Sequence, residues 1–213
     1  MPADAEKSRG RRTLDTGRLA AFSDGVFAIA ATLLVLDLAV HPPGSPLEQV
    51  LHAWPGYLGY LVSFLTIGGT WLFHTSMTDR LTRADPNFLS LNLLFLLVVA
   101  FLPFPTRLVT EALGKDEGET VAATVYGLTL LAIRVLAATM DAYARSEHLY
   151  ASREHGQDER EKRRSLPLVV IGYVIAILVG LVLPKVAVAL YFGIAVYLVV
   201  PFREVARLVF RRS

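Results

Sequence analysis

A short segment near the N-terminus places an arginine, a serine and an aspartate where a long apolar run begins. The residues read Arg18-Leu-Ala-Ala-Phe22-Ser23-Asp24 and lead into the apolar stretch 26–36. Ionisable groups at membrane depth are costly, so they are retained where an ion, a proton or a packed polar network needs them. This segment is therefore the strongest pointer to function. The alternative is an ordinary helix start, in which Ser23 or Asp24 acts as a cap.

Two more polar side chains interrupt later apolar segments. His74 follows Trp71 in the second apolar block, and Asn92 lies in the third, in Leu-Asn-Leu-Leu-Phe. At the depth of Asp24, the His74 imidazole could hydrogen-bond that carboxylate, although a buried histidine is more often structural than a proton carrier. A lone asparagine in such a run needs a partner on a neighbouring helix.

These residue types fit two further kinds of chemistry. A secondary transporter would use Asp24 and His74 as a proton relay, but the second half of the chain has no repeat of Phe-Ser-Asp. An intramembrane hydrolase would use Ser23, His74 and Asp24, but adjacent helical residues diverge by about 100°, which disfavours a triad. No Gly-x-Ser-x-Gly elbow, metal-ligand cluster or nucleotide loop occurs, and no cofactor is predicted.

The composition indicates a membrane protein. The chain has 213 residues, of which 54% are hydrophobic, with a mean hydropathy of +0.47. Only 19% are charged, against about 25% in soluble domains. Because there is no cysteine, disulfides and thiolate metal sites are excluded.

The apolar residues fall into six blocks of about bilayer length. The predicted membrane-spanning helices are 19–40, 54–77, 87–111, 120–145, 165–183 and 187–206. The fourth is weakened by Arg134 near its middle, and two prolines at 103 and 105 are expected to kink or end the third. The last two blocks, divided only at Pro184-Lys185, form either two spans or a re-entrant hairpin. We predict an all-α integral membrane protein, with a cytosolic tail (1–17) and one six-helix domain (18–213).

The basic residues predict the orientation. With the N-terminus in the cytosol, seventeen of the 21 lysines and arginines fall on the inner side, as the positive-inside rule requires. Both termini are therefore expected in the cytosol, and the protein in the cell membrane. The basic runs have a topogenic and lipid-headgroup explanation, so no nucleic-acid partner is predicted. The charged stretch 146–164 is either a helical extension or a regulatory contact.

The first helix has two different faces when wound at 100° per residue. One face is apolar, with Thr32 on its flank, and comprises Arg18, Phe22, Gly25, Ile29, Leu33 and Leu36. Asp24 points about 120° away from this stripe and Ser23 about 140° away on the other side. Asp37 follows at the predicted outer end, where an acid raises the local cation concentration. Ordinary helix packing is the alternative explanation of the apolar stripe.

Taken together, these motifs carry a family resemblance. The motifs are Arg18-x-x-x-Phe22-Ser23-Asp24, the following Ala28-Ile29-Ala-Ala-Thr32-Leu33-Leu34, Trp71 with His74, and the segment from Asn92 to Thr106. In these, the chain resembles a prokaryotic member of the transmembrane protein 175 family, potassium-permeable channels whose animal relatives work in endosomes and lysosomes. The resemblance covers the first three helices, about half of the chain.

The resemblance implies a homotetramer in which the first helices line a central pore. The constriction would be formed by Ile29, Leu33 and Leu36, with Thr32 as a hydroxyl ring that helps K⁺ pass, and the selectivity for K⁺ over Na⁺ would be modest. A polar network would hold the first helix, with the signature residues Arg18, Phe22, Ser23, Asp24, Trp71, His74 and Asn92. Arg18 also lies on the pore stripe, so either position is open for it. A proton-coupled transporter remains the alternative function.

Overall fold

The computed structural model describes residues 16–38, 45–115, 118–151 and 157–199, whose regular structure is helical apart from one isolated β-bridge. The elements in chain order are α1 (Thr16–Leu33), the 3₁₀ helix η1 (Leu34–Asp37), α2 (Pro46–His52), α3 (Trp54–Thr78), α4 (Pro86–Phe101), α5 (Pro103–Lys115), α6 (Glu119–Ser146), α7 (Gln157–Gly180) and α8 (Pro184–Val199).

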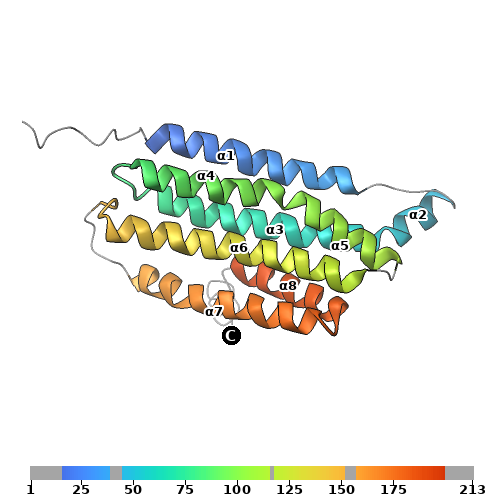
Figure 1. The fold of residues 1–213 in the computed structure, drawn as a ribbon. Helices are drawn as coiled ribbons and strands as arrows, with labels where there is room; N and C mark the ends of the chain where they lie inside the picture. The colour runs from blue at the N-terminus through green and yellow to red at the C-terminus, as the bar shows by residue number, and fades with distance from the viewer. Residues whose placement is uncertain (1–15, 39–44, 116–117, 152–156, 200–213) are drawn as a thin grey trace, which may run out of the picture.

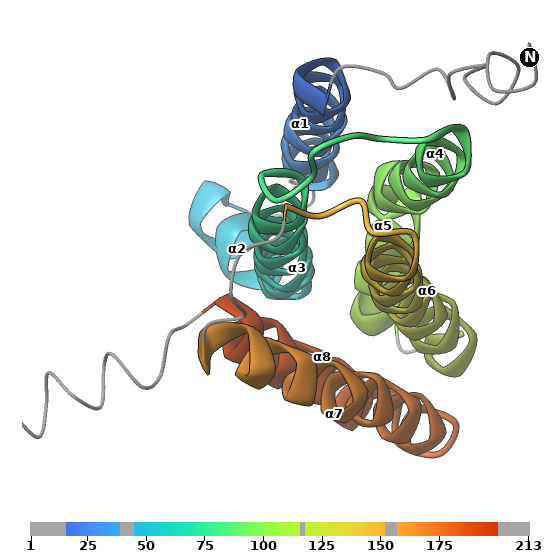
Figure 2. The same cartoon turned by 90° about the vertical axis from the view of Figure 1, so that its left-hand side faces the viewer.

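The long helices form an elongated bundle with α1 at one edge and the α7–α8 pair at the other (Figures 1 and 2). α1 packs on α3 and α4, while α7 packs on α6 and α8. The short helix α2 lies at one end of the bundle (Figure 1). Within the described part of the chain, α1 therefore has neighbours on one side only.

Among the described residues, four helical segments are long and apolar enough to cross a membrane: Thr16–Leu36, Trp54–Thr78, Pro86–Leu113 and Glu119–Ser146. They correspond to the first four predicted spans. The described parts of α7 and α8 contain two further apolar segments, Leu168–Gly180 and Pro184–Val199, at the places of the last two predicted spans.

The third predicted span consists of two helices. Pro103 and Pro105 have no N–H to donate, and the Leu102 N–H bonds the Val99 carbonyl, three residues back, at 3.2 Å. The Leu102 carbonyl accepts bonds from the N–H and the hydroxyl of Thr106 at 3.1 and 2.8 Å. The chain therefore bends between α4 and α5 without leaving this carbonyl unpaired.

Other helix limits depart from the predicted ranges for local reasons. α7 begins at Gln157, because the charged stretch before residue 165 continues the helix. α8 begins at Pro184, whose fixed φ suits the first helical position. The end of the range predicted as 187–206, and both chain termini, lie outside the described residues.

Helix α2 was not predicted. Its start is a capping box, in which the Ser45 hydroxyl accepts from the Glu48 N–H and the Glu48 carboxylate accepts from the Ser45 N–H. Pro46 occupies the first turn. The sequence Ser-Pro-Leu-Glu carries this signal, but it is obscured by the preceding prolines.

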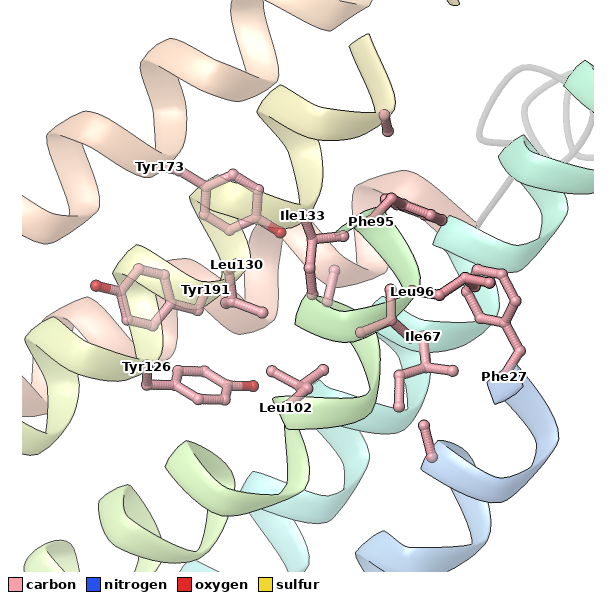
Figure 3. Close-up of a cluster of buried hydrophobic side chains, with 14 of the residues drawn as sticks. Phe27, Ile67, Phe95, Leu96, Leu102, Tyr126, Leu130, Ile133, Tyr173 and Tyr191 are labelled. Carbon is pink, nitrogen blue, oxygen red and sulfur yellow. The ribbon is translucent and has the colours of Figure 1, made fainter. Parts of the chain in front are cut away.

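Three tyrosines fill the centre of the bundle from α6, α7 and α8 (Figure 3). The Tyr126 hydroxyl lies 2.8 Å from that of Ser63 on α3, which lies 2.8 Å from that of Thr106 on α5. The Tyr191 hydroxyl donates to the Ala123 carbonyl at 3.3 Å. These bonds tie the middle helices together through polar groups that are buried and partnered.

At the end of the bundle where α3 meets α4, two connecting segments pair with each other. The Thr82 N–H donates to the Leu149 carbonyl at 2.9 Å, and the Ala151 N–H donates to the Arg80 carbonyl at 3.0 Å. Arg80 and Tyr150 both donate to the buried carboxylate of Asp141, at 3.5 and 2.7 Å. The ends of α3 and α6 are therefore joined by backbone and by side chains.

Candidate functional site

The two faces of α1 differ in what covers them. Leu19, Ser23, Phe27 and Ala30 are buried against the rest of the subunit. The opposite face is apolar and uncovered, with Ile29 61% and Leu36 72% exposed. The other exposed members of this stripe are Arg18 at its start, Phe22, Gly25 and Leu33. A contiguous apolar surface of this kind marks a contact with lipid or with another chain.

The buried face of α1 is attached by a chain of directed hydrogen bonds. The His74 Nε2 on α3 lies 2.8 Å from the Asn92 Oδ1 on α4. The Asn92 Nδ2 donates to the Ser23 Oγ at 3.2 Å, and Ser23 donates to the Leu19 carbonyl at 2.9 Å. Because an amide oxygen only accepts, the His74 Nε2 carries the hydrogen. The chain runs from α3 through α4 to α1.

Aromatic rings enclose this chain. The His74 ring stacks on that of Phe95, with centroids 5.6 Å apart and an interplanar angle of 2°. Phe27 of α1 contacts both rings, with centroid distances of 5.5 and 5.9 Å. Polar groups in such surroundings exchange partners only at high cost, so this packing fixes the rotation of α1.

A second bond joins α1 to α3 at the exposed side of the interface. The Trp71 Nε1 donates to the Asp24 Oδ1 at 2.8 Å. We expected His74 to reach this carboxylate, but Asn92 bonds His74 instead, and the indole N–H takes the carboxylate. Serine and aspartate diverge on the helix, so Ser23 faces the interior and Asp24 the rim.

We call these hydrogen bonds between α1, α3 and α4 the anchor of α1; they involve Ser23, Asp24, Trp71, His74 and Asn92. The remaining predicted residues lie outside it. Arg18 is exposed, as is Phe22, so the hydrogen-bonded part of the signature consists of the other residues. Thr32 is exposed, and its hydroxyl donates to the Ile29 carbonyl at 2.9 Å. Asp37 ends η1, and its side chain lies outside the described residues.

Sequence reasoning missed a polar cluster at the α3–α4 end of the bundle. Asp85 caps α4 by accepting from the Phe88 N–H at 2.8 Å, and its other oxygen accepts from the Tyr143 hydroxyl at 2.8 Å. The available signal was Asp85-Pro86, an N-cap followed by proline at the first helical position. The Tyr143 partner is 58 residues away and leaves no local signal.

Comparison with known protein families matches the N-terminal part of the chain, which contains α1 and its partners on α3 and α4. Residues 18–103 match the family described as endosomal/lysosomal potassium channel TMEM175. These residues include all of the side chains that anchor α1.

Full-length similarity extends beyond that segment. The chain is 38% identical over 201 residues to potassium channel B446_29190 of Streptomyces collinus, covering 90% of this chain and 98% of the relative. It is 44% identical over 128 residues to potassium channel Cha6605_3372 of Chamaesiphon minutus, covering 57% of this chain and 62% of the relative. A Gallus gallus protein named endosomal/lysosomal proton channel TMEM175 is 39% identical over 123 residues, 53% of this chain and 25% of that protein.

The fold is similar to a solved structure as well. The crystal structure of a lysosomal potassium-selective channel TMEM175 homologue from Chamaesiphon minutus superposes with a TM-score of 0.74 at 32% identity. The match covers 86% of this chain and 95% of that one. The helical arrangement agrees with the similarity to a bacterial relative over nearly its whole length, and the chain belongs to the TMEM175 family.

Proposed function

We propose that this protein is a potassium-permeable cation channel whose pore is lined by α1 from four copies of the chain. The observation that carries the proposal is the uncovered apolar face of α1, in which Ile29 and Leu36 are more than half exposed. α1 lies at the edge of the bundle (Figure 2), so one subunit encloses no pore by itself. Four such edges brought together would enclose one.

The constriction is hydrophobic. Rings of Ile29, Leu33 and Leu36 would stand on successive turns, because residues three and four apart share a helix face. A narrow apolar ring stops ions by dewetting and conducts when it widens. Asp37 at the outer mouth would concentrate cations.

Thr32 contributes the modest preference for K⁺ over Na⁺. Its hydroxyl hydrogen is directed to the Ile29 carbonyl, which leaves the oxygen lone pairs free to face the pore. Four such oxygens would replace part of the hydration shell of the ion. A flexible hydroxyl ring discriminates less than a carbonyl cage, so selectivity is modest.

The anchor of α1 determines which face of this helix lines the proposed pore. The bonds of Ser23, His74 and Asn92, and the bond of Trp71 to Asp24, hold one face of α1 toward its own subunit, which directs the other face to the axis. Gating would tilt or rotate α1 against this anchor. Arg18, at the start of α1, would lie at the cytosolic mouth.

The proposed topology has six membrane spans, with both termini in the cytosol. The proposed location of the channel is the plasma membrane. Basic residues concentrate in the segments that join the proposed inner helix ends. The α7–α8 hairpin would complete the six spans at the periphery of the tetramer, away from α1 (Figure 1).

Ion flux in liposomes tests the proposal. Purified protein is reconstituted with K⁺ inside and Na⁺ outside, with valinomycin to define the full signal and a protonophore to let protons move. Passive K⁺ flux that rises at least tenfold in Ile29→Asn is expected, because the apolar ring becomes wettable. The matched control is Leu97→Asn, which places the same polar side chain on an exposed leucine of α4 and is expected to leave flux unchanged.

The same flux assay measures the selectivity for K⁺ over Na⁺ and distinguishes a channel from a transporter. Thr32→Val is expected to lower the K⁺-to-Na⁺ flux ratio. Flux that requires an opposing proton gradient, and that is lost only on changing Asp24 or His74, would overturn the channel in favour of a proton-coupled transporter. Equal flux in Ile29→Asn and wild type would place the constriction elsewhere.

Proton permeation is a second candidate, because vertebrate relatives are named proton channels. It is measured with a pH dye in the same vesicles, in the absence of the protonophore. Proton flux that rises with Ile29→Asn together with K⁺ flux would assign both ions to one pore.

A further inference from the structure

The middle of α6 contains a buried positive charge that no side chain neutralises. Arg134 is 3% exposed, and its Nε and Nη2 atoms have no hydrogen-bond partner. Among the described residues it forms no ion pair with a carboxylate, in contrast to Arg80 and Arg145, which share Asp141. Asp141 lies seven residues further along α6, about 10 Å away at 1.5 Å per residue.

A hydroxyl on the neighbouring helix is in the same condition. The Tyr173 hydroxyl of α7 lies beside the Arg134 guanidinium and the Thr66 hydroxyl, but no hydrogen bond of standard geometry joins it to either. The ring of Tyr173 extends from α7 into the core (Figure 3). The other two central tyrosines, Tyr126 and Tyr191, each have a bonded hydroxyl, so the unpartnered one is particular to the neighbourhood of Arg134.

A third unpartnered group lies at the same depth on α3. The register is given by the bond between Ser63 and Tyr126. Thr70 is seven residues beyond Ser63 and Arg134 eight residues beyond Tyr126, which is about 10 and 12 Å along two helices running in one direction. The Thr70 hydroxyl is buried and has no partner. One turn earlier, Thr66 faces Tyr173.

These groups share one chemical requirement. A guanidinium has only donors, and hydroxyls without a partner have hydrogens to donate. A buried charge without a counter-charge is strongly destabilising, and hydrogen bonds to water do not remove the charge. An acceptor that carries a negative charge satisfies both needs.

We infer that Arg134, with the hydroxyls of Tyr173 and Thr70, binds a small monovalent inorganic anion of the halide class inside the subunit. The anion neutralises the guanidinium and accepts hydrogens from helices α3, α6 and α7. The site lies among α3, α6 and α7, while the proposed pore lies at the α1 edge, so the anion is a structural ligand of the subunit and does not permeate.

The test measures thermal stability against chloride concentration. Purified protein is melted in potassium chloride and potassium gluconate mixtures of constant ionic strength, since gluconate is too large for the core. Wild-type Tm is expected to rise saturably, by about 3–5 °C at ten times the half-saturating chloride concentration. Arg134→Met is expected to lose this dependence, and the matched control Arg107→Met, at an exposed arginine, is expected to keep it.

A second variant decides the question if Arg134→Met does not fold. Tyr173→Phe removes one donor and nothing else, so it is expected to raise the half-saturating chloride concentration about fivefold. Crystals grown in bromide are expected to give an anomalous peak beside Arg134. A wild-type Tm equal in both salts, an unchanged midpoint in Tyr173→Phe, or chloride dependence that survives in Arg134→Met would overturn the anion site. Because no ion flux is measured, these outcomes are independent of the channel proposal.

Discussion

The α1 edge and the α6–α7 region differ in whether their buried polar side chains are hydrogen-bonded. At the α1 edge, Ser23, His74 and Asn92 are buried and each is hydrogen-bonded to the next. In the α6–α7 region, the Arg134 Nε and Nη2 atoms and the Tyr173 hydroxyl are also buried, but they form no hydrogen bond of standard geometry. The first region supplies its own partners, whereas the second leaves these donors open, and we infer for it a partner from outside the chain.

The two regions also differ in what they leave uncovered. α1 is fixed by directed bonds on one face and is apolar and open on the other. Such an element has a definite orientation before any partner subunit arrives, because a satisfied polar network has one low-energy arrangement. Because these bonds lie within one subunit, each subunit alone determines the orientation of its proposed pore helix.

The largest expected loss follows from removing Asn92, the centre of the anchor. Asn92→Leu keeps the volume but leaves Ser23 and His74 buried without this partner. The free energy of unfolding should fall by about 2–4 kcal/mol, measured by reversible unfolding in mixed detergent micelles. The control is Ser90→Ala on the same helix, whose exposed hydroxyl bonds only its own helix. A loss no larger than in Ser90→Ala would contradict a stabilising role of the anchor.

A change of about 2 kcal/mol is expected on the opposite side of the bundle. A methyl group at Gly127 would meet the Tyr191 Cζ at 2.7 Å and the Ile177 Cγ1 at 2.8 Å, so Gly127→Ala forces α6 away from α7 and α8. Gly193 on α8 has no neighbouring atom within 4 Å of an added Cβ, and Gly193→Ala is expected to be neutral or stabilising. Equal Tm values for the two variants would disprove the close approach.

A coupling of about 1 kcal/mol is expected at the rim of the anchor. The indole N–H of Trp71 bonds the Asp24 carboxylate, and such charge-assisted bonds exceed neutral ones, although exposure weakens this one. A double-mutant cycle with Trp71→Phe and Asp24→Ala, each of which removes the bond, measures the coupling directly. Additive losses would mean that the two side chains contribute separately.

The smallest effect on stability is expected on the open face of α1. Thr32→Val removes a hydroxyl that bonds only the carbonyl of its own helix, so the free energy of unfolding should change by no more than about 0.5 kcal/mol. The same variant is expected to alter the K⁺-to-Na⁺ flux ratio. A large loss of stability would show that Thr32 is packed against the rest of the subunit. That result would contradict the distinction between a buried and an open face of α1.

The parts predictable from the sequence were those with a local physical signal. Hydropathy and helical period indicate the long apolar helices and the two faces of α1, and the prolines at 103 and 105 indicate the bend between α4 and α5. The capping box of α2 was also local, yet the neighbouring prolines concealed it.

Pairings between distant residues could not be predicted in the same way. Asn92 can donate or accept and Trp71 can donate, so each could pair with several groups. Which of them reaches His74 or Asp24 depends on helix rotation and crossing angle. The Tyr143–Asp85 bond joins residues with no shared motif. The unpartnered state of Arg134 depends on every helix around it, so the sequence indicated only that a charge occupies the middle of an apolar run.

The pairing of the two connecting segments has a mechanical consequence. The N–H groups of Thr82 and Ala151 donate to the Leu149 and Arg80 carbonyls across the end of the bundle, as in an antiparallel bridge, beside the Arg80–Asp141 contact. Relative sliding of α3 and α6 at this end would require these bonds to break together. The α3–α6 pair is thus held rigidly at this end, and in the proposed gating α1 would move relative to it. The amide hydrogens of Thr82 and Ala151 should exchange with solvent as slowly as those within helices, although both residues lie in connecting segments.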